Sequence, residues 1–102
     1  MQEIVAVNRS SKAQRHKIIC DRLTETYQNK NHDYGDSFSE GYKEDGLLSV
    51  KTRLMDKYFR FKTLIKAEGK VKDESIIDTL LDMANYAIMA VIEMEDDKDA
   101  HK

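Results

Sequence analysis

The chain has 102 residues, a formal net charge of -2 and a single cysteine. This length supports one domain with one modest hydrophobic core. The balanced charge excludes the broad basic surface that non-specific nucleic-acid binding requires, so nucleic acid is not an expected partner. One cysteine excludes an intrachain disulfide and a cysteine-rich zinc site. The sequence shows no signal peptide and no membrane span, so a cytoplasmic protein without a membrane partner is expected.

The composition predicts an all-α fold. Hydrophobic residues make up 40% of the chain and charged residues 35%, and with no proline and four glycines the sequence permits long helices. We expect a small antiparallel bundle of about three helices, with a long loop between the first two. Because three helices enclose a site poorly, we also expect a homo-oligomer. The expected parts are an N-terminal arm at 1–10, a single domain at 11–95 and a charged flexible tail at 96–102.

The first predicted helix is followed by a segment rich in turn formers. Ser11 and Gln14 have the spacing of a capping box, which predicts a helix that runs to about Gln28. Residues 30–41 contain Asn, Asp, Ser and two glycines, which predicts a loop of roughly a dozen residues. Loops of this length are often functional, so Asp33, Tyr34 and Phe38 are candidates for closing over a nucleotide, the two aromatic rings by stacking on its base. A turn that needs glycine would explain the same motif without a ligand.

The second predicted helix, from about 47 to 68, has two distinct faces. Apolar residues from Val50 to Ile65 recur at the spacing of an amphipathic helix. A separate face carries cations that could hold phosphate groups, with one acid among them. These residues are Arg53, Asp56, Lys57 and Arg60.

The third predicted helix is capped by Asp73 and ends near Glu93 or Glu95. It places a row of oxygen ligands opposite its apolar stripe. Such oxygens can hold a hard cation, Mg²⁺ or Mn²⁺. Alternatively, the acids form a solvated face or ion pairs with the second helix. The amide in the row could contact a base or sugar, together with Tyr86, or could satisfy a neighbouring backbone group. The row consists of Glu74, Asp78, Asp82 and Asn85.

Four motifs, in their order along the chain, resemble a bacterial and bacteriophage family known as the nucleotide-modification-associated domain, first variety. The resemblance covers about residues 30 to 92 and implies an association with nucleotide metabolism. The motifs are Asp33-Tyr34-Gly35 with Ser37-Phe38, Gly46-Leu47-Leu48, Arg53-Leu54-x-Asp56-Lys57-x-x-Arg60, and Glu74-Ser75-x-x-Asp78-Thr79-Leu80-x-Asp82-x-Ala84-Asn85-Tyr86-Ala87.

The last two predicted helices also look like those of all-α nucleoside triphosphate pyrophosphatases of the MazG and dimeric dUTPase type. This second resemblance implies hydrolysis of a (deoxy)nucleoside triphosphate, with Asp78 and Asp82 as catalytic residues. It further implies a magnesium ion held by Glu74, Asp78 and Asp82, with Asp56 assisting.

The sequence departs from the first acidic motif of these enzymes, because Arg53-x-x-Asp56 supplies one acid where they have two. An alternative function therefore stays open, that of a non-catalytic module binding a nucleotide or a protein, for example a phage factor with a host protein target.

Overall fold

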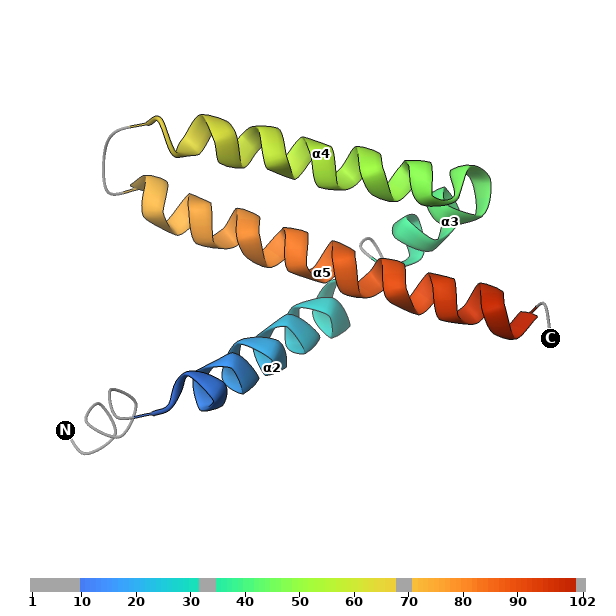
Figure 1. Cartoon of the computed structure of the whole chain (residues 1–102), viewed down its shortest axis with the longest axis horizontal. Coiled ribbons are helices and arrows are strands. Elements are labelled where there is room, and N and C mark those ends of the chain that lie inside the picture. The colour runs from blue at the N-terminus through green and yellow to red at the C-terminus, as the bar shows by residue number, and fades with distance from the viewer. Residues whose placement is uncertain (1–9, 32–34, 68–70, 101–102) are drawn as a thin grey trace.

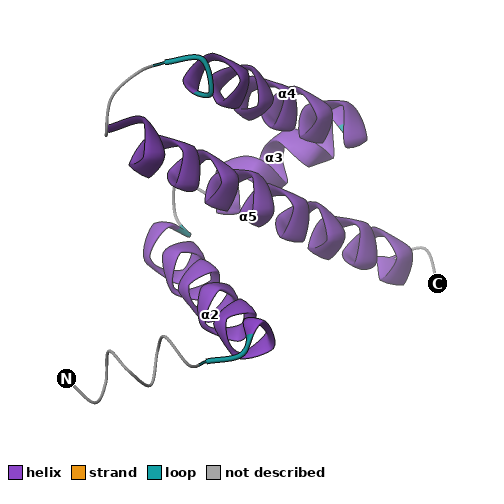
Figure 2. Cartoon of the chain, turned by 60° about the vertical axis from the view of Figure 1, so that its left-hand side comes forward, coloured by secondary structure: helices purple, strands orange, loops and turns teal. Residues whose placement is uncertain are grey.

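The computed structural model describes residues 10–31, 35–67 and 71–100. Within these ranges the chain forms four helices and no strand, which confirms the all-α prediction (Figure 1, Figure 2). The helices are α2 (Lys12–Lys30), α3 (Gly35–Asp45), α4 (Leu47–Leu64) and α5 (Val71–Ala100).

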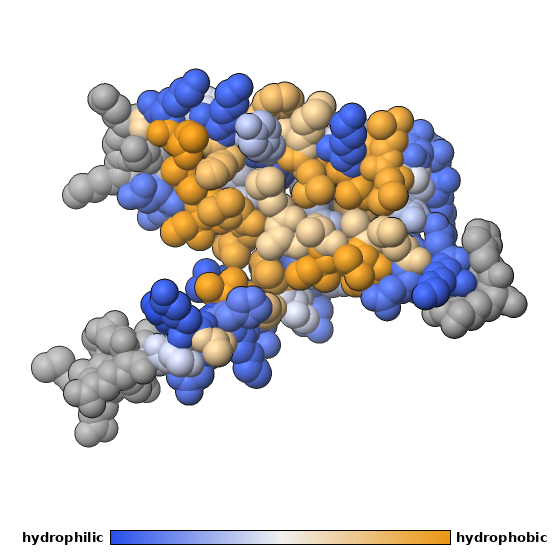
Figure 3. Space-filling view, in the orientation of Figure 1, coloured by the Kyte–Doolittle hydropathy of each residue, from blue (hydrophilic) through white to orange (hydrophobic). Residues whose placement is uncertain are grey.

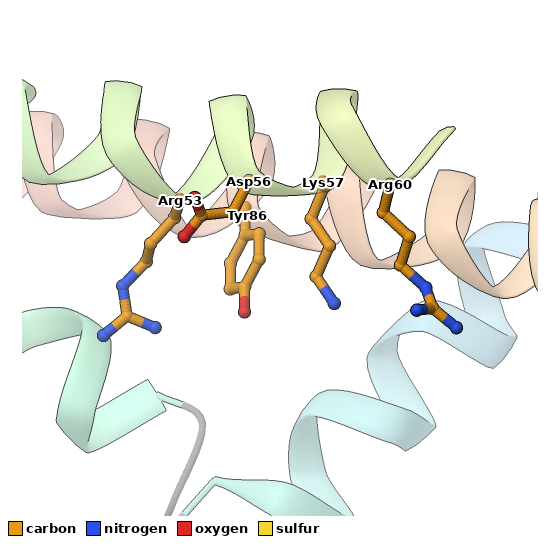
Figure 4. Close-up of a pocket in the computed structure, with 5 residues that line it drawn as sticks. All are labelled: Arg53, Asp56, Lys57, Arg60 and Tyr86. Atoms are coloured by element: carbon orange, nitrogen blue, oxygen red, sulfur yellow. The ribbon is translucent and has the colours of Figure 1, made fainter. Parts of the chain in front are cut away.

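The central unit is an antiparallel hairpin of α4 and α5 (Figure 1). The short helix α3 packs against both members of the hairpin, and α2 crosses α5 near its middle. Figure 4 shows α2 and α3 on the same side of the hairpin. The other side of the hairpin is therefore left without a covering helix among the described residues.

The start of α2 follows the predicted capping box. The Ser11 hydroxyl accepts a hydrogen bond from the Gln14 backbone N–H at 3.1 Å, and the Gln14 side chain accepts one from the Ser11 N–H at 2.8 Å. The helix reaches Lys30, slightly beyond the predicted end at Gln28. Its one buried residue is Leu23, whose carbonyl oxygen accepts a hydrogen bond from the Asn85 amide of α5 at 3.1 Å. This buried bond ties α2 to the hairpin.

The prediction of a long loop between the first two helices is wrong, because α3 occupies residues Gly35–Asp45. The turn-forming composition of this segment is overridden by burial, since the Phe38 ring is 1% exposed and packs against Val50 and Met89. Asp36 in the first turn also complements the helix dipole. The corner into α4 is made by Gly46, whose φ of 62° suits glycine, and its N–H donates to the Tyr42 carbonyl at 2.7 Å.

Both long helices also differ from their predicted ends. α4 stops at Leu64, short of the predicted end near residue 68. α5 starts at Val71, so Asp73 lies in its first turn and is not the N-cap.

The C-terminal part of α5 continues as helix to Ala100, through most of the segment predicted as a tail. It is held there by α3. The Ser39 hydroxyl donates a hydrogen bond to the Glu93 carboxylate. A hydrogen bond from Tyr42 to Asp97 raises the pKa of the tyrosine.

One stretch of the described helices, Asp73–Lys98 in α5, is long and apolar enough to cross a membrane by length and composition. Some of its polar side chains are engaged inside the bundle, whereas Asp73, Glu74 and Asp78 are exposed. Asp82 forms an ion pair with Lys57 of α4, and Thr79 and Asn85 are buried against neighbouring helices. This stretch therefore contributes polar contacts to the helical bundle as well as apolar ones.

Candidate functional site: a cation-lined hollow on the hairpin

Three cations of α4 line an open hollow of about 450 Å³ beside α5. Arg53, Lys57 and Arg60 follow one another at four- and three-residue spacing, which places them on one face of the helix. Figure 4 shows their side chains pointing from α4 into the same space, on the side of the hairpin where α2 and α3 lie. Asp56 of α4 and Tyr86 of α5 complete the lining.

Arg53 is held in place at one end of the hollow. Its guanidinium carbon lies 5.5 Å from the centroid of the Phe38 ring and 5.7 Å from that of Tyr86, within range of cation–π attraction. The two rings stack with centroids 5.9 Å apart and planes 13° from parallel. The Nη2 atom of Arg53 also donates to the Ser37 hydroxyl at 3.2 Å. The guanidinium therefore keeps one orientation before any ligand arrives.

Lys57 lies at the middle of the hollow and is paired with an acid of α5. Its Nζ atom is 2.9 Å from Oδ2 of Asp82, and both side chains are partly exposed. A pair of this kind contributes about 0–1 kcal/mol, because water and salt screen it. The pair can therefore open at little cost when a competing anion approaches.

Arg60 and Asp56 are exposed, and their side chains make no hydrogen bond or ion pair with other residues in the part of the chain that the structure describes. Arg60 stands at the opposite end of the hollow from Arg53 (Figure 4). The two arginines are separated by two helical turns, about 10 Å along the axis. This span accommodates several consecutive phosphate groups.

The predicted row of acids on α5 is present, but it is not gathered into a metal centre. Glu74, Asp78 and Asp82 follow at one-turn intervals, so the outer two lie about 12 Å apart along the axis and cannot share one ion. Among residues 10–31, 35–67 and 71–100, no three His, Cys, Asp or Glu side chains come together as metal ligands. Magnesium already bound to phosphates needs only one or two carboxylates. Asp82 and its neighbour Asp78 could supply them only after Lys57 moves.

Two residues predicted to contact a nucleotide are buried. Asn85 is 4% exposed, and its amide donates a hydrogen bond to the carbonyl oxygen of Leu23. This agrees with the alternative in which the amide satisfies a neighbouring backbone group. Phe38 lies beneath Arg53 in the core and not on a loop, so the expectation that it closes over a base is wrong. Asp33 and Tyr34 lie outside the described residues. Ser37 belongs to one of the family motifs, but its role in holding Arg53 becomes apparent only once α3 is placed.

The fold and the hollow define a small all-α protein with a cluster of cations on one face of a helical hairpin. The chain belongs to the family described as nucleotide modification associated domain 1, whose model matches residues 30–94. The matched range contains α3, α4 and every residue that lines the hollow. Comparisons with curated proteins and with solved structures gave no match.

Proposed function

We propose that the protein binds a nucleotide, with the phosphate chain lying across Arg53, Lys57 and Arg60. The observation that carries this proposal is the convergence of three cationic side chains of α4 in one open hollow. Guanidinium groups bind phosphate oxygens through paired hydrogen bonds, and a lysine ammonium adds a compact point charge. The description of the family also refers to nucleotides.

Each lining residue has a distinct part in this proposal. Arg53 supplies a donor whose orientation is already fixed by the Phe38–Tyr86 stack. Lys57 exchanges its partner Asp82 for phosphate, which costs little because the pair is partly exposed. Arg60, which is exposed and has no polar partner among the described residues, closes on the far end of the phosphate chain. Tyr86 offers the one aromatic group of the lining to the sugar or base.

The proposal predicts that Arg60→Gln weakens nucleoside triphosphate binding by roughly 10- to 100-fold, the loss expected for a charge-assisted hydrogen bond. The unfolding midpoint should stay within about 2 °C of the parent, because the Arg60 side chain touches no described polar partner. Isothermal titration calorimetry with a panel of canonical and modified nucleotides measures the affinity.

Lys66→Gln is the matched control for this titration. Lys66 is an exposed cation just beyond the end of α4, and it lines a second hollow of about 360 Å³ with Phe59, Lys62 and Thr63. Its loss removes the same charge and should change the affinity less than about twofold. Equal losses in the two variants would mean that the basic helix attracts nucleotides without a defined site.

Magnesium-dependent hydrolysis of the bound triphosphate is a second candidate function. It rests on the resemblance of the sequence to that of the MazG-type pyrophosphatases, and on Asp78 and Asp82, which follow one turn apart on α5, with Asp82 beside Lys57. Magnesium would supply charge neutralisation and an activated water. Because Asp82 is engaged by Lys57 and Glu74 lies beyond reach, nucleotide binding is the function that the site supports best.

A pyrophosphate-release assay with Mg²⁺ or Mn²⁺ separates the two candidates. Release that Asp82→Asn abolishes, while the variant keeps its unfolding midpoint, would establish the enzyme. Nucleotide binding without release would identify a binding module, as expected from the single acid of the Arg53-x-x-Asp56 motif.

A further inference from the structure

The side of the hairpin away from α2 and α3 is an exposed apolar face. Figure 3 shows apolar residues extending over both α4 and α5 on this side. α5 turns Asn85 and Met89 toward the covered side, and α4 turns Arg53 and Arg60 there, so the opposite surfaces of both helices face outward. The exposed large residues of the outward surfaces include Leu48, Met55, Tyr58 and Ile65 of α4 and Ile77, Leu80, Val91 and Met94 of α5.

The α5 part of this face has the spacing of a helix–helix contact. Six residues recur at alternating three- and four-residue intervals, which is the repeat of the packed positions in coiled coils, and none of them is charged. They extend over about 25 Å of helix. We call them the α5 seam: Ile77, Leu80, Ala84, Ala87, Val91 and Met94.

The α5 seam is symmetric about its own midpoint. Two alanines lie at the centre, with two large apolar residues on each side. Two helices that cross approach most closely at the crossing point, and small side chains permit that approach. An antiparallel copy would place Ala84 against Ala87 of the second copy, and Leu80 against its Val91. The seam is thus complementary to itself, as a two-fold interface requires.

The total exposed area of the chain leaves room for such an interface. The chain exposes 8202 Å², whereas a compact monomer of its mass exposes roughly 6,000 Å². This total covers the whole chain, the residues outside the described ranges included, and a stable interface needs only about 800 Å² of it per partner. The small core agrees with this, since only Leu23, Phe38, Val50, Met89 and Ala90 are buried apolar residues among those described.

Charge disfavours the parallel arrangement. The C-terminal part of α5 carries Glu93, Glu95, Asp96 and Asp97. A parallel pair would bring these two acidic segments side by side, with mutual repulsion. An antiparallel pair instead brings each of them to the hairpin end of the other copy. Exposed cations, Lys62 of α4 and Lys66 just beyond it, accompany the exposed acids Asp73, Glu74 and Asp78 of α5 there.

We propose that the protein is a two-fold symmetric dimer in which the α5 seams of two copies pack antiparallel, with the axis between Ala84 and Ala87. The cation-lined hollow lies on the opposite side of each hairpin and stays open to its ligand in the dimer. The proposal is therefore independent of the proposed function.

Sedimentation equilibrium tests the dimer with the full chain. The parent should have twice the chain mass of 11.9 kDa. Val91→Lys should raise the dissociation constant by roughly 100-fold or more, because it buries an unpaired charge in the seam. Ile92→Lys is the matched control. Val91 is 53% exposed and Ile92 is 43% exposed, but Ile92 lies off the α5 seam. The Ile92→Lys protein should remain a dimer. A monomeric parent, or sedimentation only with lipid vesicles, would overturn the proposal.

Cross-linking tests the orientation, in a Cys20→Ser background that removes the native thiol. Mild oxidation of the Leu80→Cys variant mixed with the Val91→Cys variant should give a disulfide-linked heterodimer, whereas Leu80→Cys alone should not cross-link. Cross-linking of Leu80→Cys to itself would show a parallel pair and contradict the proposed axis.

Discussion

Phe38→Ala is expected to lower the free energy of unfolding by about 3–5 kcal/mol, the usual cost of removing a buried phenylalanine ring. The ring is 1% exposed, packs against Val50, Met89 and Ala90, and stacks on Tyr86. In so small a core no other side chain can fill the space. Urea denaturation followed by circular dichroism measures the change.

Phe59→Ala is the control for Phe38→Ala, because the Phe59 ring is half exposed on α4. It should cost less than about 1 kcal/mol. If both variants lost the same stability, α3 would not be packed on the hairpin as described. A Phe38→Ala protein that stays folded should also bind nucleotides more weakly, because Arg53 loses one of the two rings that fix its guanidinium.

Asn85→Asp is expected to destabilise the protein by about 2–4 kcal/mol at pH 7, because it buries a carboxylate against the carbonyl oxygen of Leu23. Burial and that carbonyl raise the pKa of the new acid in the folded state above its unfolded value of about 3.9. At a pH below the folded-state pKa, the neutral carboxyl group can donate a hydrogen bond to the Leu23 carbonyl oxygen, as the amide does. Stability is therefore retained at low pH and lost as the pH rises through the folded-state pKa.

Urea denaturation between pH 4 and pH 7 checks this dependence, with Asn29→Asp, an exposed position of α2, as the control. The control should lose little stability at either pH. A loss in Asn85→Asp that did not change with pH would mean that the amide is needed for its shape and not for its hydrogen bond to α2.

Much of the fold is predictable from the sequence because it depends on local signals. The capping box at Ser11 and the apolar spacing of α4 predict helices without knowledge of their neighbours. α3 escapes prediction because its glycines and serines favour turns, whereas the burial of Phe38 beneath Arg53 stabilises it as a helix. That burial depends on contacts with α4 and α5, which are distant in the chain.

The candidate site also has features that depend on local spacing and features that depend on long-range contacts. Spacing along one helix predicts that Arg53, Lys57 and Arg60 share a face, and the structure brings them to one hollow. Spacing cannot predict which acid of α5 meets which cation of α4, so the Lys57–Asp82 pair becomes visible only in the packed hairpin. The same holds for Asn85, whose amide reaches a carbonyl oxygen of α2.

The most direct test of nucleotide binding in the hollow is a titration of the isotopically labelled protein with a nucleoside triphosphate, followed by NMR. The proposal predicts that the largest shifts of backbone and side-chain signals fall on Arg53, Lys57, Arg60 and Tyr86, with release of the Lys57–Asp82 pair. Shifts centred on the second hollow around Phe59 and Lys66, or no shifts at millimolar nucleotide, would contradict it.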